Sequence, residues 1–313
     1  MIYCVGDLMV DVLARLSAPL AVGTDTPAPI AVLGGGSAAN TASWLAHAGV
    51  PATFVGRVGD DAFGRAQRGA LSSYGLDLAL SVDPSLPTGT CIVLVDVAGE
   101  RTMIPDAGAN AALSPAHVPV SSFAPGDHLH VSGYALFGGA REAALHAMSS
   151  ARSVGMSISV GAASAGPLRS VGAAAFLEWI GTDVLLFANH DEAAVLARFA
   201  ADTSVAELAN GLAARVGRAI VTCGADGAVY CDGSAPVSVP APEVAVVDST
   251  GAGDAFAAGV LAAFAYGAAA EPALEYAHAL AAAACALTGA RPGARPVSAA
   301  RRPGTRGPGA SDT

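Results

Sequence analysis

Short, fully apolar runs alternate along the chain with longer segments rich in alanine. The short runs predict buried strands, and the longer segments, whose apolar positions recur at helical spacing, predict helices. Strands are expected at residues 2–5, 52–56, 128–131, 156–160, 184–187, 219–222 and 228–231. Helices are expected at residues 41–48, 63–74, 141–154, 191–199, 205–215, 255–266 and 272–287. Because most strands are separated by helices, the pattern indicates an α/β fold with a mostly parallel sheet covered on both faces.

Two stretches interrupt this alternation. Residues 12–33 look extended and are rich in Pro and Thr, and residues 90–104 contain an alternating strand, a turn at Ala98-Gly99 and a returning strand. The second pattern is typical of a β-hairpin. We therefore expect a small β-sheet lid over the main sheet, built from about residues 12–33 and 88–106.

The chain ends in a stretch of different composition. Residues 291–313 are rich in Pro, Gly and Arg and contain almost no apolar residues. Such a segment cannot bury enough apolar surface to fold, so we predict a disordered tail there. Residues 1–290 are then expected to form one domain, with the lid inserted in it.

Charge and composition exclude several classes of protein. The formal net charge of −10 argues against nucleic acid as a partner. All 16 of the residues counted as Lys or Arg are Arg. Without lysine, a Walker A phosphate loop, a protein-kinase ATP site and a Schiff-base enzyme are excluded. The five cysteines form no CxxC or Cys/His cluster, so no structural zinc site is expected.

The sequence does not predict a membrane protein. Its most apolar stretch, residues 255–270, is shorter than the roughly 20 residues that a spanning helix needs. The N-terminus has no basic segment followed by a long apolar run, so no secretory signal is expected. These features favour a cytoplasmic protein that contacts no membrane.

The strongest candidate for chemistry is the sequence DSTGAGD at residues 248–254, directly before an alanine-rich helix. A glycine turn that enters a helix presents backbone N–H groups and a partial positive charge to an anion. Gly251 and Gly253 would let a phosphate approach the backbone closely. A carboxylate at Asp254 would repel that anion unless it serves as a base for a hydroxyl proton. The alternative is an ordinary N-capped helix after a glycine turn.

This motif resembles the second signature, D-T-x-G-A-G-D, of the ribokinase-like (PfkB) carbohydrate kinase family. The glycine run GGGSAAN is similar to the first signature of that family and lacks the G-x-G-x-x-G of dinucleotide-binding proteins. This run occupies residues 34–40, and further similar segments follow it in the family's order: residues 57–64, residues 108–111, Asn189-x-x-Glu192 and Thr222-x-Gly224. The resemblance covers about residues 1–290. It implies a three-layer α/β/α fold with a mostly parallel central sheet and a small β-sheet lid.

The resemblance also implies an activity, which is transfer of the γ-phosphoryl group of ATP to a hydroxymethyl group of a small sugar. In that reaction Asp254 would be the base, worth about 10²–10⁴ in rate. The amides of Gly251, Ala252 and Gly253 would form the anion hole. The residues expected to bind the sugar are Asp11, Gly35, Gly36, Asn40 and Asp254. Asp7 is the alternative carboxylate. Arg101 in the predicted lid would either reach an anionic or polar group of the substrate or remain solvated.

ATP and Mg²⁺ are the cofactors that the resemblance implies, with K⁺ as a further candidate. The residues expected to bind ATP are Asn189, Glu192, Thr222, Gly224, Gly227 and His278. Glu192 would act on Mg²⁺ through water, although Asn189 and Glu192 also fit a helix-capping pair. Asp248 resembles part of the family's monovalent-cation loop. A histidine on a helix face, such as His278, is often structural.

Three positions depart from the ribokinase pattern, namely Met9, Ser37 and Gly161, and no Glu follows the strand near residues 131–134. A ribose-like sugar is the favoured substrate. A nucleoside kinase of the same family is the first alternative, with Met9, Met103 and Tyr134 available to clamp a base. An inactive sensor of sugar or nucleotide is the second. The family resemblance further implies a homodimer formed through the lid.

Overall fold

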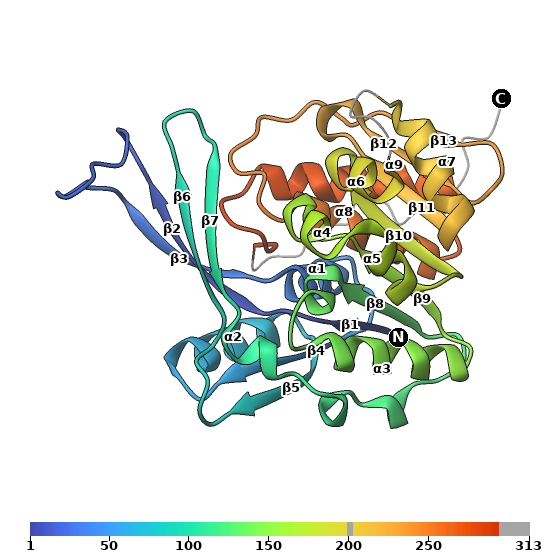
Figure 1. The fold of residues 1–313 in the computed structure, drawn as a ribbon, viewed down its shortest axis with the longest axis horizontal. Coiled ribbons are helices and arrows are strands. Elements are labelled where there is room, and N and C mark those ends of the chain that lie inside the picture. The colour runs from blue at the N-terminus through green and yellow to red at the C-terminus, as the bar shows by residue number, and fades with distance from the viewer. Residues whose placement is uncertain (199–202, 294–313) are drawn as a thin grey trace, which may run out of the picture.

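A mostly parallel central sheet with helices on both faces forms the body of the protein (Figure 1). The computed structural model describes residues 1–198 and 203–293. From residue 294 onward, the predicted tail lies outside the described part of the chain. The strand order is β13-β12-β11-β10-β9-β8-β1-β4-β5. The three-layer α/β/α fold expected from the sequence is thereby confirmed.

Neighbouring strands of this sheet are parallel from β5 across to β11, and β12 and β13 extend it antiparallel at one edge. The carboxyl ends of the parallel strands therefore meet along one edge of the body. The strands are β1 (Ile2–Val5), β4 (Ala52–Gly59), β5 (Asp77–Asp83), β8 (His128–Ser132), β9 (Ser157–Gly161), β10 (Val184–Asn189), β11 (Gly217–Thr222), β12 (Ala228–Cys231) and β13 (Val237–Val239).

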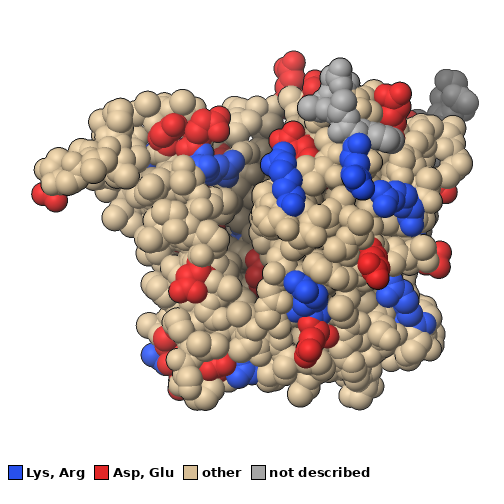
Figure 2. Space-filling view, viewed as in Figure 1, with Lys and Arg blue, Asp and Glu red and all other residues tan. Residues whose placement is uncertain are grey.

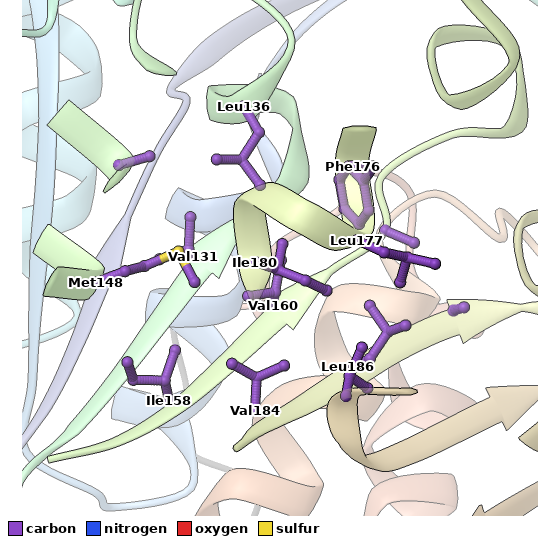
Figure 3. Packing of buried hydrophobic residues seen from close by; sticks show 14 of the residues in the cluster. Val131, Leu136, Met148, Ile158, Val160, Phe176, Leu177, Ile180, Val184 and Leu186 are labelled. Carbon is purple, nitrogen blue, oxygen red and sulfur yellow. The ribbon is translucent and has the colours of Figure 1, made fainter. Parts of the chain in front are cut away.

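Apolar side chains form a separate core on each face of the sheet. The helices over the first core are α3 (Arg141–Ser153), α4 (Ala165–Val171), α5 (Ala173–Ile180), α6 (His190–Ala197) and α7 (Val205–Val216). Figure 3 shows Phe176 and Ile180 of α5 gathered there with Val160 and Val184 of the sheet. The helices over the second core are α1 (Ser37–His47), α2 (Ala62–Ser73), α8 (Ala252–Ala265) and α9 (Ala270–Cys285).

Helix α8 is buried from Ala255 to Ala263 because it packs against α1 and α9 as well as the sheet. The contact with α9 is close, since a Cβ on Gly259 would lie 2.5 Å from the Cα of Ala277. A helix held in this way fixes the position of the loop at its N-terminus, which is the DSTGAGD motif. Among the described residues, no helix combines the length and apolar character needed to cross a membrane.

The predicted lid is a separate small sheet that projects from the body (Figure 1). Its strands, in the order β3-β2-β6-β7, are β2 (Met9–Arg15), β3 (Ile30–Gly35), β6 (Thr90–Val95) and β7 (Arg101–Asp106). Leu13, Val93 and Val95 are buried on one face, whereas Ile92 and Ile104 are among several exposed apolar side chains of the lid. Strand β2 begins at Met9, before the predicted lid boundary at about residue 12, so Asp11 lies within a lid strand.

Several predicted boundaries were wrong for identifiable reasons. Helix α1 begins at Ser37 instead of residue 41, because the carboxylate of Asp7 accepts a hydrogen bond from the Ser37 amide and caps the helix from another segment. Strand β4 continues to Gly59, past the predicted end at residue 56. The pattern also missed β5, β13, α4 and α5, which are short or lie at the edge of the fold. The predicted helix at 191–199 ends at Ala197, and its last position is outside the described residues.

Short 3₁₀ segments connect several of these elements. They are η1 (Gly108–Ala112), η2 (Pro115–His117), η3 (Val120–Ser122), η4 (Gly133–Leu136) and η5 (Gly224–Asp226).

Candidate active site

The sequence motifs meet at the carboxyl edge of the central sheet, where parallel α/β folds generally bind their ligands. Figure 2 shows a hollow between the lid and the body of the molecule. Segment 248–254 approaches Ser37 and Asn40 of α1 there, although more than 200 residues separate them in the chain. The fold thus brings the two strongest motifs into direct contact.

Asp254 is held by two side chains of α1. Ser37 Oγ donates to Asp254 Oδ1 at 2.8 Å, and Asn40 Nδ2 donates to Asp254 Oδ2 at 2.8 Å. Burial raises the pKa of Asp254 to about 7, against the two hydrogen bonds, which lower it, and with the help of the negative charges of Asp7 and Asp11. A carboxyl group that titrates near neutrality is suited to accept a proton from a hydroxyl group.

The loop before α8 is shaped by Gly251. This residue is the N-cap of α8 with φ +76°, and a Cβ there would lie 2.6 Å from Ala290. A Cβ on Gly253, in contrast, would meet nothing within 4 Å. Gly253 and Asp254 lie in the first helical turn, where amides have no acceptor inside the helix. Of the three amides predicted to form the anion hole, that of Ala252 donates to the carbonyl of Ser249 at 3.3 Å. The role of the Gly251 and Gly253 amides in binding an anion stays a prediction.

Asp248 ties this loop to the segment after α9. Its Oδ1 accepts hydrogen bonds from the amide and hydroxyl of Thr250 at 2.9 and 2.6 Å, and its Oδ2 accepts one from the Gly289 amide at 3.0 Å. Burial alone would raise the pKa of Asp248, but these hydrogen bonds and the nearby Arg101 hold it below its ordinary value. Asp248 is therefore an ionised structural clamp, and a role in binding K⁺ remains a prediction.

Arg101 reaches this loop from the lid. Its guanidinium donates to Asp248 Oδ1 at 3.3 Å and also to the hydroxyl groups of Ser249 and Thr250. Arg101 is thus bound to the loop before α8 rather than solvated, and its contact with a substrate group stays a prediction. Through Arg101 the position of the lid is linked to that loop.

Of the two carboxylates predicted as candidates to bind the sugar, Asp11 and Asp7, only Asp11 is available to a ligand. It is 8% exposed, and no hydrogen-bond donor among the described residues is assigned to it. Its carboxyl group lies against Gly35, where a Cβ would come within 2.6 Å of it. Asp7, the alternative, already accepts hydrogen bonds from the Ser37 amide at 2.9 Å and the Ser132 hydroxyl at 2.8 Å. Asp11 can therefore accept hydroxyl groups of a ligand, whereas Asp7 caps α1.

Gly36 provides the sharp entry into α1 from the lid. It has φ +93°, and a Cβ there would lie 2.6 Å from the carbonyl oxygen of Asp7. Only glycine fits this position without strain. The sequence signal GGGSAAN is thus explained by close packing at Gly35 and Gly36 followed by helix α1.

Asn189 and Glu192 form the helix cap that the sequence left open as an alternative. The Glu192 amide donates to Asn189 Oδ1, and the amide and side chain of Asn189 donate to the two oxygens of Glu192, each at 2.9 Å. Burial raises the pKa of Glu192. Asn189 ends β10 next to Thr222 of β11, and Glu192 lies in the first turn of α6. A helix cap and a contact with ATP at this place are therefore compatible.

A cavity of about 340 Å³ lies next to this cap. It is lined by Asn189, His190, Asp191, Thr222, Cys223 and Gly224. All six of these residues lie within the two predicted ATP-binding segments, residues 189–192 and residues 222–224. A larger cavity of about 710 Å³ lies at the amino ends of the strands and includes none of the predicted site residues, so its size is not a guide to the chemistry.

Gly227 and His278 have structural explanations. Gly227 has φ +102°, and a Cβ there would collide with the carbonyl of Val239 at 2.2 Å. His278 is buried, its Nε2 donates to Val239 O at 3.2 Å, and its ring packs against Phe256. Both residues therefore stabilise the turn and edge around β12 and β13, and this placement does not support the predicted contact of His278 with adenine.

Arg291 is a site residue that the sequence analysis missed. Its guanidinium donates to Asn40 Oδ1 at 3.2 Å, Gln67 Oε1 at 2.8 Å and the carbonyl of Gly35 at 2.7 Å. The predicted start of the disordered tail at residue 291 is therefore wrong, because Arg291 belongs to the site. The pattern of apolar residues gave no sign that Arg291 is part of the fold, because this residue begins the Pro/Gly/Arg-rich stretch at the end of the chain.

A model of the pfkB family of carbohydrate kinases matches residues 1–296. The chain belongs to the PfkB carbohydrate kinase family. An ATP-dependent ribose-1-phosphate kinase of Halopiger xanaduensis is 33% identical over 263 residues, which cover 84% of this chain and 82% of that protein. A fructokinase of Salmonella typhimurium is 32% identical over 279 residues, with 84% of each chain covered. The structure of adenosine kinase from Sinorhizobium meliloti is similar with a TM-score of 0.85 and 26% identity, over 93% of this chain and 95% of that one.

This PfkB protein is therefore a sugar or nucleoside kinase, a phosphotransferase that acts on an alcohol group. ATP binding follows from membership of the family. The family resemblance, which was assigned from the motifs to about residues 1–290, is confirmed over that whole length.

The buried carboxyl group of Asp11, which has no assigned hydrogen-bond donor, is expected to lower the stability of the folded protein when it is ionised. Burial raises the pKa of Asp11 to about 6, against the nearby Arg291, which lowers it. Ionised Asp11 therefore destabilises the folded kinase at pH 8, and the penalty disappears as the pH falls from about 6 toward 4. Asp11→Asn is expected to raise the free energy of unfolding by on the order of 2 kcal/mol at pH 8, but little at pH 4. Denaturant unfolding at both pH values measures this, and an equal effect at the two would contradict it.

Proposed function

We propose that this PfkB kinase transfers the γ-phosphoryl group of ATP to a hydroxymethyl group of a small sugar, and that a ribose-like sugar is preferred. The observation that carries the proposal is the position of Asp254 in the first turn of α8, where the helix amides have no acceptor inside the helix. Ser37 and Asn40 of α1 donate hydrogen bonds to its two carboxylate oxygens. Base and anion site thus share one rigid element. Asp11 adds an available acceptor for sugar hydroxyl groups on the lid side.

In this mechanism the sugar hydroxyl oxygen attacks the γ-phosphorus of ATP and Asp254 takes the hydroxyl proton. The new bond joins the sugar oxygen to phosphorus, the bond to the β-phosphate oxygen breaks, and ADP leaves. Ser37 and Asn40 keep both oxygens of Asp254 oriented, which reduces the reorganisation needed at the moment of transfer. The amides at the start of α8 stabilise charge on the transferring group, where one such donor is worth about 10²–10³ in rate.

Mg²⁺ fits this site as an ion held mainly by nucleotide phosphates and water. Among residues 1–198 and 203–293, no group of three or more His, Cys, Asp or Glu side chains is arranged to bind a metal. Mg²⁺ keeps several waters and needs few protein ligands when phosphates are present, and it would neutralise phosphate charge. Glu192, with Asn189 holding its oxygens, would orient one such water, and Thr222 and Gly224 would border the phosphates in the adjoining cavity.

The relatives support a substrate with a small sugar ring. Ribose 1-phosphate, fructose and adenosine, which the names of the similar kinases specify, all carry a hydroxymethyl group on such a ring. Two of the residues that depart from the ribokinase pattern, Met9 and Ser37, form hydrogen bonds inside the protein. Met9 Sδ accepts a hydrogen bond from Asn110 at 3.3 Å, and Ser37 bonds to Asp254. At Gly161 a Cβ would meet nothing within 4 Å, which leaves open space.

A nucleoside substrate is the second candidate. Tyr134 follows β8 at the carboxyl edge and is 43% exposed, and Met103 of the lid is 53% exposed. Both side chains are thus available to an apolar base. An inactive sensor is the weaker alternative, because the proposed base Asp254 is present in the first turn of α8 and is held by Asn40. A homodimer through the exposed apolar residues of the lid and activation by K⁺ also remain proposals from the family resemblance.

The proposal is tested by measuring ADP formation from Mg-ATP with ribose, ribose 1-phosphate, fructose, adenosine and inosine. We expect the highest kcat/KM with ribose or ribose 1-phosphate. Turnover confined to adenosine and inosine would favour the nucleoside kinase. Tight ATP binding without turnover of any sugar or nucleoside, including 2-keto-3-deoxygluconate, tagatose and pseudouridine, would favour the sensor.

A further inference from the structure

Arg291 is an arginine that neither the motifs nor the proposed chemical step uses. Its guanidinium contacts three different elements, through Asn40 of α1, Gln67 of α2 and Gly35 of β3. All three acceptors are neutral oxygens. In the described part of the chain no carboxylate forms an ion pair with this guanidinium. Because no single carboxylate pairs with this guanidinium, its positive charge can stabilise several nearby carboxylates at once.

The backbone around Arg291 is anchored from two sides. Trp44 Nε1 donates to the carbonyl of Ala290 at 2.9 Å, and the hydroxyl of Tyr74 donates to the carbonyl of Pro292 at 2.8 Å. Gly34 makes room for the guanidinium, because a Cβ there would lie 2.5 Å from Arg291 Nη1. The side chain therefore occupies one defined position beneath the lid.

We propose that Arg291 is a positioning residue of the active site, which orients the side-chain amide of Asn40 toward Asp254 and supplies a fixed positive charge to the sugar side. The inference rests on the proposed function, since it concerns the same base. It extends the site to a segment of the chain that lies beyond both family motifs.

The amide of Asn40 explains the orienting effect. Its Oδ1 accepts from Arg291 Nε at 3.2 Å, while its Nδ2 donates to Asp254 Oδ2 at 2.8 Å. If this amide rotated by half a turn, an NH₂ group would face the guanidinium and an oxygen would face the carboxylate of Asp254. Both contacts would then be repulsive. Arg291 thus selects the one orientation in which Asn40 supports the base.

The charge of Arg291 acts on a site that is otherwise acidic. The ionisable groups that interact with it are Asp7, Asp11, Asp254 and the hydroxyl of Tyr74. Arg291 lowers the pKa of Asp11 against the effect of burial, and Asp7 and Asp11 in turn raise the pKa of Asp254. Removing the charge is therefore expected to favour protonation of Asp11 and Asp254, which are the groups that must be ionised for sugar binding and proton abstraction.

The test compares Arg291→Met with Arg291→Lys. In Arg291→Met, kcat/KM at pH 7 is expected to fall about 10- to 100-fold, because the base loses its orientation. The acidic limb of the pH profile is expected to move upward by about one pH unit. Arg291→Lys keeps the charge without the bond from Nε, so it should retain a near-normal pH profile while kcat/KM stays reduced. An Arg291→Met enzyme with wild-type kcat/KM and pH profile would overturn the proposal.

Two controls separate positioning from a structural role. Tyr74→Phe removes the hydrogen bond to Pro292 and loosens the same segment without touching the guanidinium. Gln67→Leu removes one anchor of Arg291 but leaves its bond to Asn40. Both are expected to lower kcat/KM less than about threefold and to leave the pH profile in place. If Tyr74→Phe reproduces the Arg291→Met effect, Arg291 only holds the C-terminal segment and the proposal fails.

A spectroscopic measurement keeps this inference distinct from the proposed function. In protein labelled at Asp carboxyl and Asn side-chain amide groups, NMR can follow Asp11, Asp254 and Asn40 without substrate. Arg291→Met is expected to raise the titration midpoints of both carboxyl groups and to shift the Asn40 amide signal. If the wild type phosphorylates nothing in the panel, the proposed function fails, and these titrations still decide the role of Arg291. Unchanged midpoints would overturn it even in an active kinase.

Discussion

Replacing Asp254 by Asn is expected to lower kcat by about 10²–10⁴-fold while ATP binding stays within about threefold of the wild type. The carboxylate is the group available to take the hydroxyl proton, and an amide cannot accept it at neutral pH. Nucleotide contacts are expected from the far side of the site, around Thr222 and Gly224, and do not involve this side chain. ADP formation and calorimetric titration with ATP measure the two quantities.

Asp254→Asn should leave the fold intact, which makes it a clean test. Asn40 Nδ2 can still donate to the oxygen of the new amide, and the Ser37 hydroxyl can rotate to accept from its NH₂ group. The variant also removes a carboxyl group whose ionisation burial disfavours. Its unfolding free energy should therefore not fall below that of the wild type above pH 7. A variant that folds, binds ATP and keeps more than a tenth of wild-type kcat would show that Asp254 is not the base.

The same carboxyl group predicts the pH dependence of the wild-type enzyme. Burial raises the pKa of Asp254 to about 7, so kcat/KM should rise with pH up to that value and level off above it. The buried Asp11, with a pKa of about 6, should steepen the acidic limb, because both carboxyl groups must lose a proton.

The most predictable parts of the site were those whose conformation depends on residues close together in the chain, such as glycine turns and helix caps. DSTGAGD marks a helix entry with glycines, and the structure has that helix entry with Gly251 at a positive φ. The pairing of Asn189 with Glu192 was likewise visible as a possible cap, since such caps are local in sequence. The lid was predictable from an interrupted alternation, because its hairpin strands are neighbours in the chain.

Contacts between distant segments were not predictable from one sequence. Helix α1 starts at Ser37 because Asp7 caps it from the end of β1, and the pattern of α1 alone does not contain that information. Arg291 lies in a Pro/Gly/Arg-rich stretch, and contacts with residues far away in the chain, such as Trp44 and Tyr74, hold its segment at the site. The hydrogen bond of His278 to Val239 was also not predicted, because Val239 belongs to a short edge strand that the pattern missed.

Gly251→Ala is expected to lower kcat by about 10²–10³-fold and to destabilise the kinase by about 2–3 kcal/mol. Gly251 has φ +76°, where an alanine is strained, and its Cβ would lie 2.6 Å from Ala290. Ala290 cannot move away freely, because its carbonyl accepts the hydrogen bond from Trp44 Nε1. The loop must therefore shift instead, and the amides at the start of α8 move away from the position that the phosphoryl group would occupy.

Gly253→Ala is the matched control, because the same atom is added two residues later in the same loop. A Cβ at Gly253 meets nothing within 4 Å, and this glycine has no positive φ. The free energy of unfolding of the Gly253→Ala variant should therefore stay within about 0.5 kcal/mol of the wild-type value. If Gly253 faces the transferring phosphoryl group, activity should nevertheless fall, because the added methyl group occupies the space of the ligand. Gly253→Ala would then separate ligand crowding from the loop strain of Gly251→Ala, whereas full activity in both variants would exclude this loop as the anion site.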